Sequence, residues 1–129
     1  MIGIDTNVLV RFITEDDPRQ SELARDLFER SPIFIPKTVL LESEWVLRDG
    51  YEFARSAIAA AIRTVLGLSN VSVEDASAVG RALEWYDEGV DFADALHLSS
   101  CEQAAGFATF DRMLARRARS IRSAPVELL

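Results

Sequence analysis

Four carboxylate side chains occupy positions in this sequence where an ionised group needs a partner. Asp5 ends the apolar stretch IGID, Glu42 and Asp94 lie among apolar residues of predicted helices, and Asp111 ends FATFD. If they converge, like charges about 4 Å apart repel by ~4 kcal/mol per pair at an effective dielectric of about 20. Raised pKa values or a bound divalent cation would relieve this repulsion.

The available ligand types narrow the choice of cation. The chain has one histidine, His97, and one cysteine, Cys101, which cannot build a Cys/His zinc site. We expect His97 to be a packed or hydrogen-bonded helix residue rather than a ligand. Hard carboxylate oxygens favour Mg²⁺ or Mn²⁺, and water bound to such an ion can become the nucleophile of phosphodiester hydrolysis.

Several of these acids also have a structural interpretation. Asp5 and Asp111 each follow a predicted strand and could cap the next helix. Asp91 is the predicted N-cap of its helix, and Asp94, three residues later, completes a D-x-x-D variant of the capping box. Capping explains Asp91 better than Asp94, because Asp94 shares an inward helix face with Leu98.

Two glutamates in TVLLESEWVLRDG are distinguished by helical geometry. Glu42 and Glu44 lie about 200° apart on a helix and cannot share a face. Glu44 precedes Arg48 by four residues, which predicts a solvated surface pair. Glu42 lies with Val39 and Trp45 on an apolar face and has no such explanation.

Hydroxyl groups accompany two of the acids. Thr6 follows Asp5, and Thr109 precedes Asp111 by two positions. Each hydroxyl could orient the neighbouring carboxylate or its ligand.

The charge distribution adds a basic segment to an acidic chain. The net charge is −7, which argues against general affinity for nucleic acid. Five arginines nevertheless fall within eleven residues, and without them the chain would carry −12. Arg112, Arg116 and Arg119 have i, i+4, i+7 spacing and form one helix face. This face either holds a phosphate backbone or is simply solvated.

Length and composition predict one domain spanning residues 1–129, because 129 residues with 49% hydrophobic content can bury a single core. No apolar run approaches eighteen residues, and the start, MIGIDTNVLV, does not read as a signal peptide. We therefore expect a soluble, cytoplasmic protein.

Strand and helix patterns alternate along the chain. Residues 14–17 offer an acidic cap for a helix that has Pro18 at its first helical position and runs to about Arg30. This helix should place Leu23, Leu27 and Phe28 in the core. An alternation of this kind predicts an α/β fold with a mainly parallel sheet covered by helices on both faces, and a site at the carboxyl ends of the strands. The predicted strands are 2–5, 33–35, 71–73, 107–110 and 126–129, and the predicted helices are 18–30, 38–48, 54–66, 75–85, 92–105 and one beginning at 111.

Four sequence blocks, in order and over nearly the whole chain, resemble the PIN-domain nucleases and specifically the VapC-type toxins of bacterial toxin–antitoxin modules. They are IGIDTNVLVRFI, LLESEWVL, DFADALHL and ATFDRML. The resemblance implies a three-layer α/β/α fold with a central sheet of four to five strands. It also implies a metal-dependent endoribonuclease that uses one or two Mg²⁺ or Mn²⁺ ions.

The same resemblance assigns roles to residues. Asp5, Glu42, Asp94 and Asp111 match the four acidic positions, with Asp5 and Asp94 expected as the principal metal ligands. Thr6 and Thr109 match the flanking hydroxyl positions, and Asp91 is expected to support the site. The implied partners are an RNA substrate, a VapB-type antitoxin and a second copy of the chain, with operator DNA bound only through the antitoxin complex.

Other interpretations remain open at this stage. A PIN-like scaffold could act mainly through its antitoxin complex without nuclease activity. An aspartate-nucleophile phosphatase normally has a second acid two residues after the first, where this chain has Asn7. A phospho-receiver domain needs a lysine on a late strand, and Lys37 is the only lysine.

Overall fold

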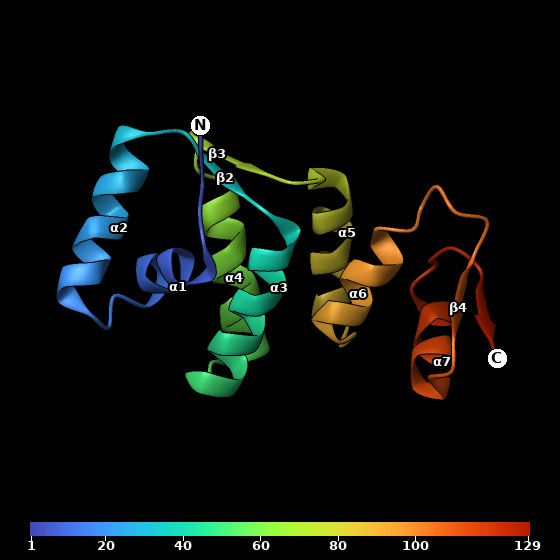
Figure 1. Ribbon diagram of the computed structural model, residues 1–129. Helices are drawn as coiled ribbons and strands as arrows, with labels where there is room; N and C mark the ends of the chain where they lie inside the picture. The colour runs from blue at the N-terminus through green and yellow to red at the C-terminus, as the bar shows by residue number, and fades with distance from the viewer. The chain divides into compact units, whose positions relative to one another are not determined.

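The sheet at the start of the chain is built from short apolar strands. The computed structural model describes all 129 residues and divides into two units, Met1–Ala76 and Ser77–Leu129, each described by itself. In the first unit, β1 (Ile2–Gly3), β2 (Ile33–Ile35) and β3 (Val71–Val73) form a parallel sheet in the order β1-β2-β3 (Figure 1). Ile33 and Ile35 are fully buried, so the middle strand anchors the core.

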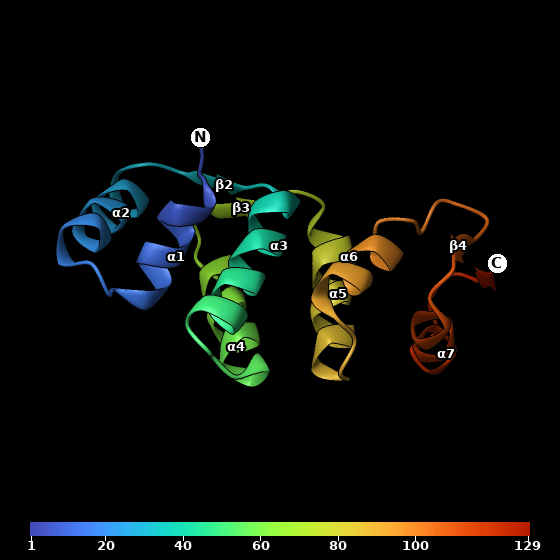
Figure 2. The same cartoon turned by 60° about the horizontal axis from the view of Figure 1, so that its bottom comes forward.

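Five helical segments belong to the first unit, and the start of α2 (Pro18–Arg30) follows the sequence signals. Asp17 caps α2 by accepting a hydrogen bond from the Gln20 N–H, and Pro18 takes the first helical position. Figure 1 and Figure 2 both show α3 and α4 lying side by side. The helices are α1 (Thr6–Thr14), α2 (Pro18–Arg30), α3 (Lys37–Trp45), the π-helical turn η1 (Val46–Gly50) and α4 (Arg55–Leu66).

The second unit contains three helices and a small two-stranded sheet. Tyr86 of α5 and Phe92 of α6 pack edge to face with ring centroids 5.3 Å apart, which joins these two helices. The ribbons of α5 and α6 lie side by side in Figure 1 and Figure 2. The two strands, β4 and β5, are parallel. The elements are α5 (Ala76–Asp87), α6 (Phe92–Ser99), β4 (Phe107–Thr109), α7 (Arg112–Ser120) and β5 (Val126–Leu128).

The predicted α/β class with parallel strands is confirmed, and all five predicted strands are present. The strands form two sheets, of three and two strands, where the sequence predicted one sheet of four to five. Strand pairing depends on contacts between distant segments, so the local pattern located the strands without fixing their partners. None of the helices combines the length and apolar character needed to cross a bilayer.

Two helix predictions were wrong, and one helix was not predicted. The helix expected to reach residue 105 ends at Ser99, and residues 100–105 form turns before Gly106. The helix expected over 38–48 becomes π-helical from Val46, where the Tyr51 N–H bonds the Val46 carbonyl. The pattern also failed to predict α1, whose β-branched and aromatic residues favour strands. In each case tertiary contacts compete with local propensity.

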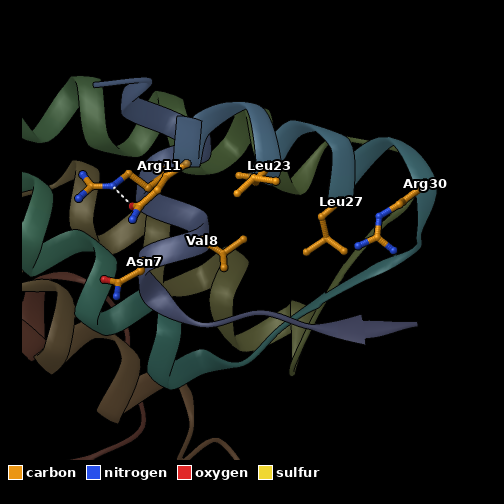
Figure 3. Close-up of a pocket in the computed structure, with 8 residues that line it drawn as sticks. Asn7, Val8, Arg11, Leu23, Leu27 and Arg30 are labelled. Carbon is orange, nitrogen blue, oxygen red and sulfur yellow. Dashed lines mark hydrogen bonds between the residues drawn. The ribbon is translucent and has the colours of Figure 1, made fainter. Parts of the chain in front are cut away.

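The predicted core face of α2 was wrong for one residue. Phe28 is buried and stacks on Phe12, but Leu23 is 57% exposed. Figure 3 shows Leu23 and Leu27 of α2 and Val8 of α1 beside a pocket between the two helices. The pocket has a volume of about 370 Å³. The buried stripe of α2 therefore runs through Ser21, Ala24 and Phe28 instead.

Candidate active site

In the first unit, Thr6 connects two of the predicted acids. Its backbone N–H donates to Asp5 Oδ1 at 2.7 Å, and its hydroxyl donates to Glu42 Oε1 at 2.5 Å. Thr6 itself is only 6% exposed, whereas Asp5 and Glu42 are both exposed. One buried residue at the start of α1 thus holds a carboxylate from the end of β1 and a carboxylate from α3.

In the second unit, three predicted acids line one pocket. Asp91, Asp94 and Asp111 surround a hollow of about 200 Å³ between the α5–α6 turn and the start of α7. Asp94 is half-buried, and burial is the main cause that raises its pKa above the ordinary aspartate value. The negative charges of Asp91 and Asp111 raise that pKa further, and His97 partly opposes them. Ionised Asp94 is therefore unfavourable in this pocket unless a positive charge is close.

The helix-cap interpretation is confirmed for Asp5, Asp91 and Asp111. Asp91 Oδ2 accepts from the Asp94 N–H at 3.3 Å, and Asp111 Oδ1 accepts from the Met113 and Leu114 N–H groups at 2.9 and 3.1 Å. Each of these caps uses one carboxylate oxygen. Capping therefore fixes the orientation of the side chain and leaves its other oxygen available for a ligand.

Thr109 acts on Asp111 through the backbone. Its hydroxyl accepts a hydrogen bond from the Asp111 N–H at 2.9 Å. The hydroxyl therefore orders the turn from β4 into α7 and sets the position from which the Asp111 carboxylate projects. It does not contact that carboxylate itself.

The predicted arginine face is present on α7. Arg112, Arg116 and Arg119 line a shallow pocket of about 180 Å³ together with Leu128. These three side chains are exposed and take part in no ion pair. Because α7 also begins at Asp111, one helix carries both an acid of the candidate site and three unpaired guanidinium groups.

The two glutamates of α3 have the reverse of their predicted surroundings. Glu44 was predicted to be solvated, but its side chain is 2% exposed and is bound by Arg48 Nε at 2.7 Å. Glu42 was predicted to lie on an apolar face, but it is exposed, and Trp45 beside it is 54% exposed. The helical period separated the two residues correctly, but only the packing neighbours decided which face is buried.

The interpretation of His97 was also wrong. His97 was predicted to be packed or hydrogen-bonded, and its side chain is exposed. It lies one turn after Asp94 on α6, and its charge lowers the pKa of Asp94, in opposition to the burial and the like charges that raise it. Its effect on the pocket is therefore electrostatic.

Arg117 was missed by the sequence argument. It lines the same pocket as Asp91, Asp94 and Asp111, and its Nη1 donates to the Glu88 carbonyl at 3.3 Å. The i, i+4, i+7 spacing left Arg117 off the predicted arginine face. Only the packing of α7 against the α5–α6 turn brings it to the acids, so no local signal could have identified it.

The donor groups fit a hard divalent cation by their chemistry. The pocket of the second unit offers carboxylate oxygens and no thiolate, and its central acid, Asp94, has a pKa raised by burial and by like charges. A bound cation would offset both effects. Within either unit, no group of three His, Cys, Asp or Glu side chains is gathered closely enough to hold a metal ion.

Comparison with known families agrees with the fold. The model of the PIN domain family matches residues 2–120, so the chain belongs to the PIN domain family. PIN domains are generally metal-dependent nucleases, and membership indicates a nuclease-like function that acts on nucleic acid. No curated protein matches the chain.

Proposed function

We propose that this protein is a metal-dependent endoribonuclease and the toxin of a VapBC-type toxin–antitoxin module. The observation that carries the proposal is the pocket lined by Asp91, Asp94 and Asp111 in a chain that belongs to the PIN domain family. The resemblance of the four sequence blocks to VapC-type toxins supports the finer assignment. Residues 1–129 then act as one domain, and the implied partners are a VapB-type antitoxin and a second copy of the chain.

The proposed roles follow from the surroundings of each acid. Asp5 and Asp94 are the principal ligands of Mg²⁺ or Mn²⁺, with one or two ions bound. Glu42, oriented by Thr6, and Asp111, oriented by its cap bonds, complete the acidic set by holding a second ion or by orienting the attacking water. The cation would supply a polarised water and neutralise charge on the phosphate.

The overall reaction is hydrolysis of an RNA phosphodiester. Water adds to the phosphorus, the bond to the leaving oxygen breaks, and the leaving oxygen takes a proton. The arginine face of α7 binds phosphates of the RNA strand on either side of the bond that is cut. This face consists of Arg112, Arg116 and Arg119. Because the rest of the protein is acidic and repels phosphates, RNA binds at α7 rather than over the whole surface.

The proposal is tested by mapping cleaved RNA. The 5′ ends of cellular RNA are sequenced after the chain is induced, in parallel with an Asp5→Asn chain. We expect new 5′ ends only with the unmodified chain. In vitro, the purified chain should cut single-stranded or loop RNA with Mn²⁺, and EDTA should stop the reaction. Cleavage that persists in a clean Asp5→Asn preparation would overturn the proposal.

Metal titration distinguishes the nuclease from a PIN-like scaffold. A nuclease should bind Mn²⁺ stoichiometrically in a calorimeter, and the Asp94→Asn chain should not. A folded chain that binds no Mn²⁺ and cuts no RNA, yet still binds its antitoxin, would instead support the scaffold.

A further inference from the structure

Arg117 stands among the acids of the second unit without pairing to any of them. The pocket that holds Asp91, Asp94 and Asp111 is also lined by Arg117. The guanidinium makes one hydrogen bond, from Nη1 to the Glu88 carbonyl, and no carboxylate lies within ion-pair distance of it. Most of its N–H donors are therefore free.

Gly89 provides the surface on which this guanidinium lies. A Cβ atom at residue 89 would stand 3.1 Å from Arg117 Nη1, 3.6 Å from Nη2 and 3.7 Å from Cζ. Gly89 also has a φ of +99°, which L side chains rarely adopt. The α5–α6 turn is thus shaped so that an arginine from α7 can lie across it at the edge of the acidic pocket.

A purely structural role explains this arrangement poorly. The single bond at 3.3 Å is longer than the usual N–H···O distance, and Arg117 is exposed. An arginine used only to neutralise the acids would pair with one of them directly. Because the Arg117 guanidinium lies apart from the three acids, the pocket suits a ligand with two parts. One part would bind a metal ion held by the acids, and the other, an anionic group, would bind the guanidinium.

From these contacts we propose that Arg117 binds a phosphate oxygen of the RNA at the acidic pocket, next to the bond that is cut. This inference rests on the proposed function. Arg117 does not line the pocket of Arg112, Arg116 and Arg119, although it shares a further hollow with Arg116. The free N–H groups of its guanidinium match the bidentate geometry of a phosphate.

The experiment measures cleavage of a labelled single-stranded RNA with Mn²⁺ over a range of KCl concentrations. For Arg117→Gln we expect KM to rise about tenfold with kcat changed less than about twofold, because a ground-state phosphate contact is lost. The slope of log KM against log salt should fall by about 0.7, the value for one single-strand phosphate contact. Arg117→Lys should restore the salt slope and only part of the affinity.

Arg122→Gln is the matched control. It removes the same charge from the same unit, and Arg122 lines none of the pockets described above. The inference is overturned if Arg117→Gln leaves KM and the salt slope unchanged, if Arg122→Gln changes them equally, or if Arg117→Gln lowers only the melting temperature. Failure of the unmodified chain to cut RNA would instead reject the proposed function on which the inference rests.

Discussion

The hydroxyl of Thr6 donates a hydrogen bond to Glu42 Oε1 at 2.5 Å, across 36 positions of sequence. The same residue binds Asp5 Oδ1 through its backbone N–H. Thr6 is buried, so its geometry is set by packing rather than by solvent. Thr6 therefore positions both acids of the first unit. A site that binds a ligand through carboxylates needs such fixed orientations.

Thr6→Val should impair the site more than the fold. The change keeps the shape and removes the hydrogen bond, so we expect the free energy of unfolding to fall by about 1–2 kcal/mol. Cleavage should fall at least tenfold, since Glu42 loses its orientation. Thr6→Ser, which keeps the hydroxyl, should retain most activity; equal losses from both variants would contradict a role that belongs to the hydroxyl alone. Denaturant unfolding and Mn²⁺-dependent cleavage provide the two measurements.

Substitutions at Asp94 and at Asp91 should have different effects, the first on metal binding and the second on stability. Burial and like charges raise the pKa of Asp94, so its ionised form opposes folding when no cation is bound. Asp94→Asn should therefore abolish Mn²⁺ binding while leaving the free energy of unfolding in EDTA equal or higher. Calorimetric titration and denaturant unfolding test this pair of effects. A large loss of stability in EDTA would contradict the role assigned to Asp94.

Asp91 is the counterpart in that comparison. Asp91→Ala removes the N-cap bond to the Asp94 N–H and should cost about 1 kcal/mol, whereas Asp91→Asn should keep the cap. If Asp91→Asn loses Mn²⁺ binding as fully as Asp94→Asn, then Asp91 is itself a ligand and the division between the two residues is wrong.

Arg48 should matter far more for stability than Arg25. Arg48 binds Glu44, whose side chain is 2% exposed, whereas Arg25 pairs with Glu15 where both side chains are solvated. We expect Arg48→Ala to lower the free energy of unfolding by about 2–3 kcal/mol, because a buried carboxylate loses its bonds from the guanidinium. Arg25→Ala should cost less than about 1 kcal/mol. Similar values in urea titrations would contradict the burial of Glu44.

The contrast between these residues shows what local sequence can and cannot predict. Asp91 and Asp111 are N-caps as predicted, and Asp17 provides the acidic cap predicted before Pro18, because a cap depends on residues within one turn. The burial of Glu44 and the arrival of Arg117 at the acids depend on which helix packs against which turn. The candidate acids could be proposed from their chemistry and their positions in the sequence. The contacts that support them could not, because those contacts form only when distant segments pack together.

A separate polar cluster predicts a pH dependence of stability. Asp16 accepts hydrogen bonds from the Tyr51 and Thr14 hydroxyls and from Arg11, and these contacts lower the pKa of Asp16 in the folded chain, the Tyr51 bond most strongly. A lowered pKa stabilises the fold above the unfolded pKa of about 3.9, and the stabilisation is lost as pH falls through the lower folded value.

Asp16→Asn should therefore be less stable than the unmodified chain near pH 7, and the difference should shrink as pH falls below about 4. Thermal unfolding over about pH 2–7 measures it. Asp26→Asn is a suitable control because Asp26 is exposed on α2 and its side chain takes part in no hydrogen bond or ion pair. A difference between Asp16→Asn and the unmodified chain that stays constant down to about pH 2 would contradict the lowered pKa.

Two glycines should respond oppositely to alanine. A Cβ atom at residue 80, in α5, would meet no neighbouring heavy atom within 4 Å, so Gly80→Ala should raise the free energy of unfolding by about 0.5–1 kcal/mol through helix propensity. Gly89 has a φ of +99° and supports Arg117, so Gly89→Ala should cost about 1–3 kcal/mol. It should also raise KM for RNA, because the guanidinium is displaced. Urea titrations and cleavage kinetics measure the two effects. A Gly89→Ala chain that is destabilised yet keeps its KM would show that the strain of the turn and the position of Arg117 are independent.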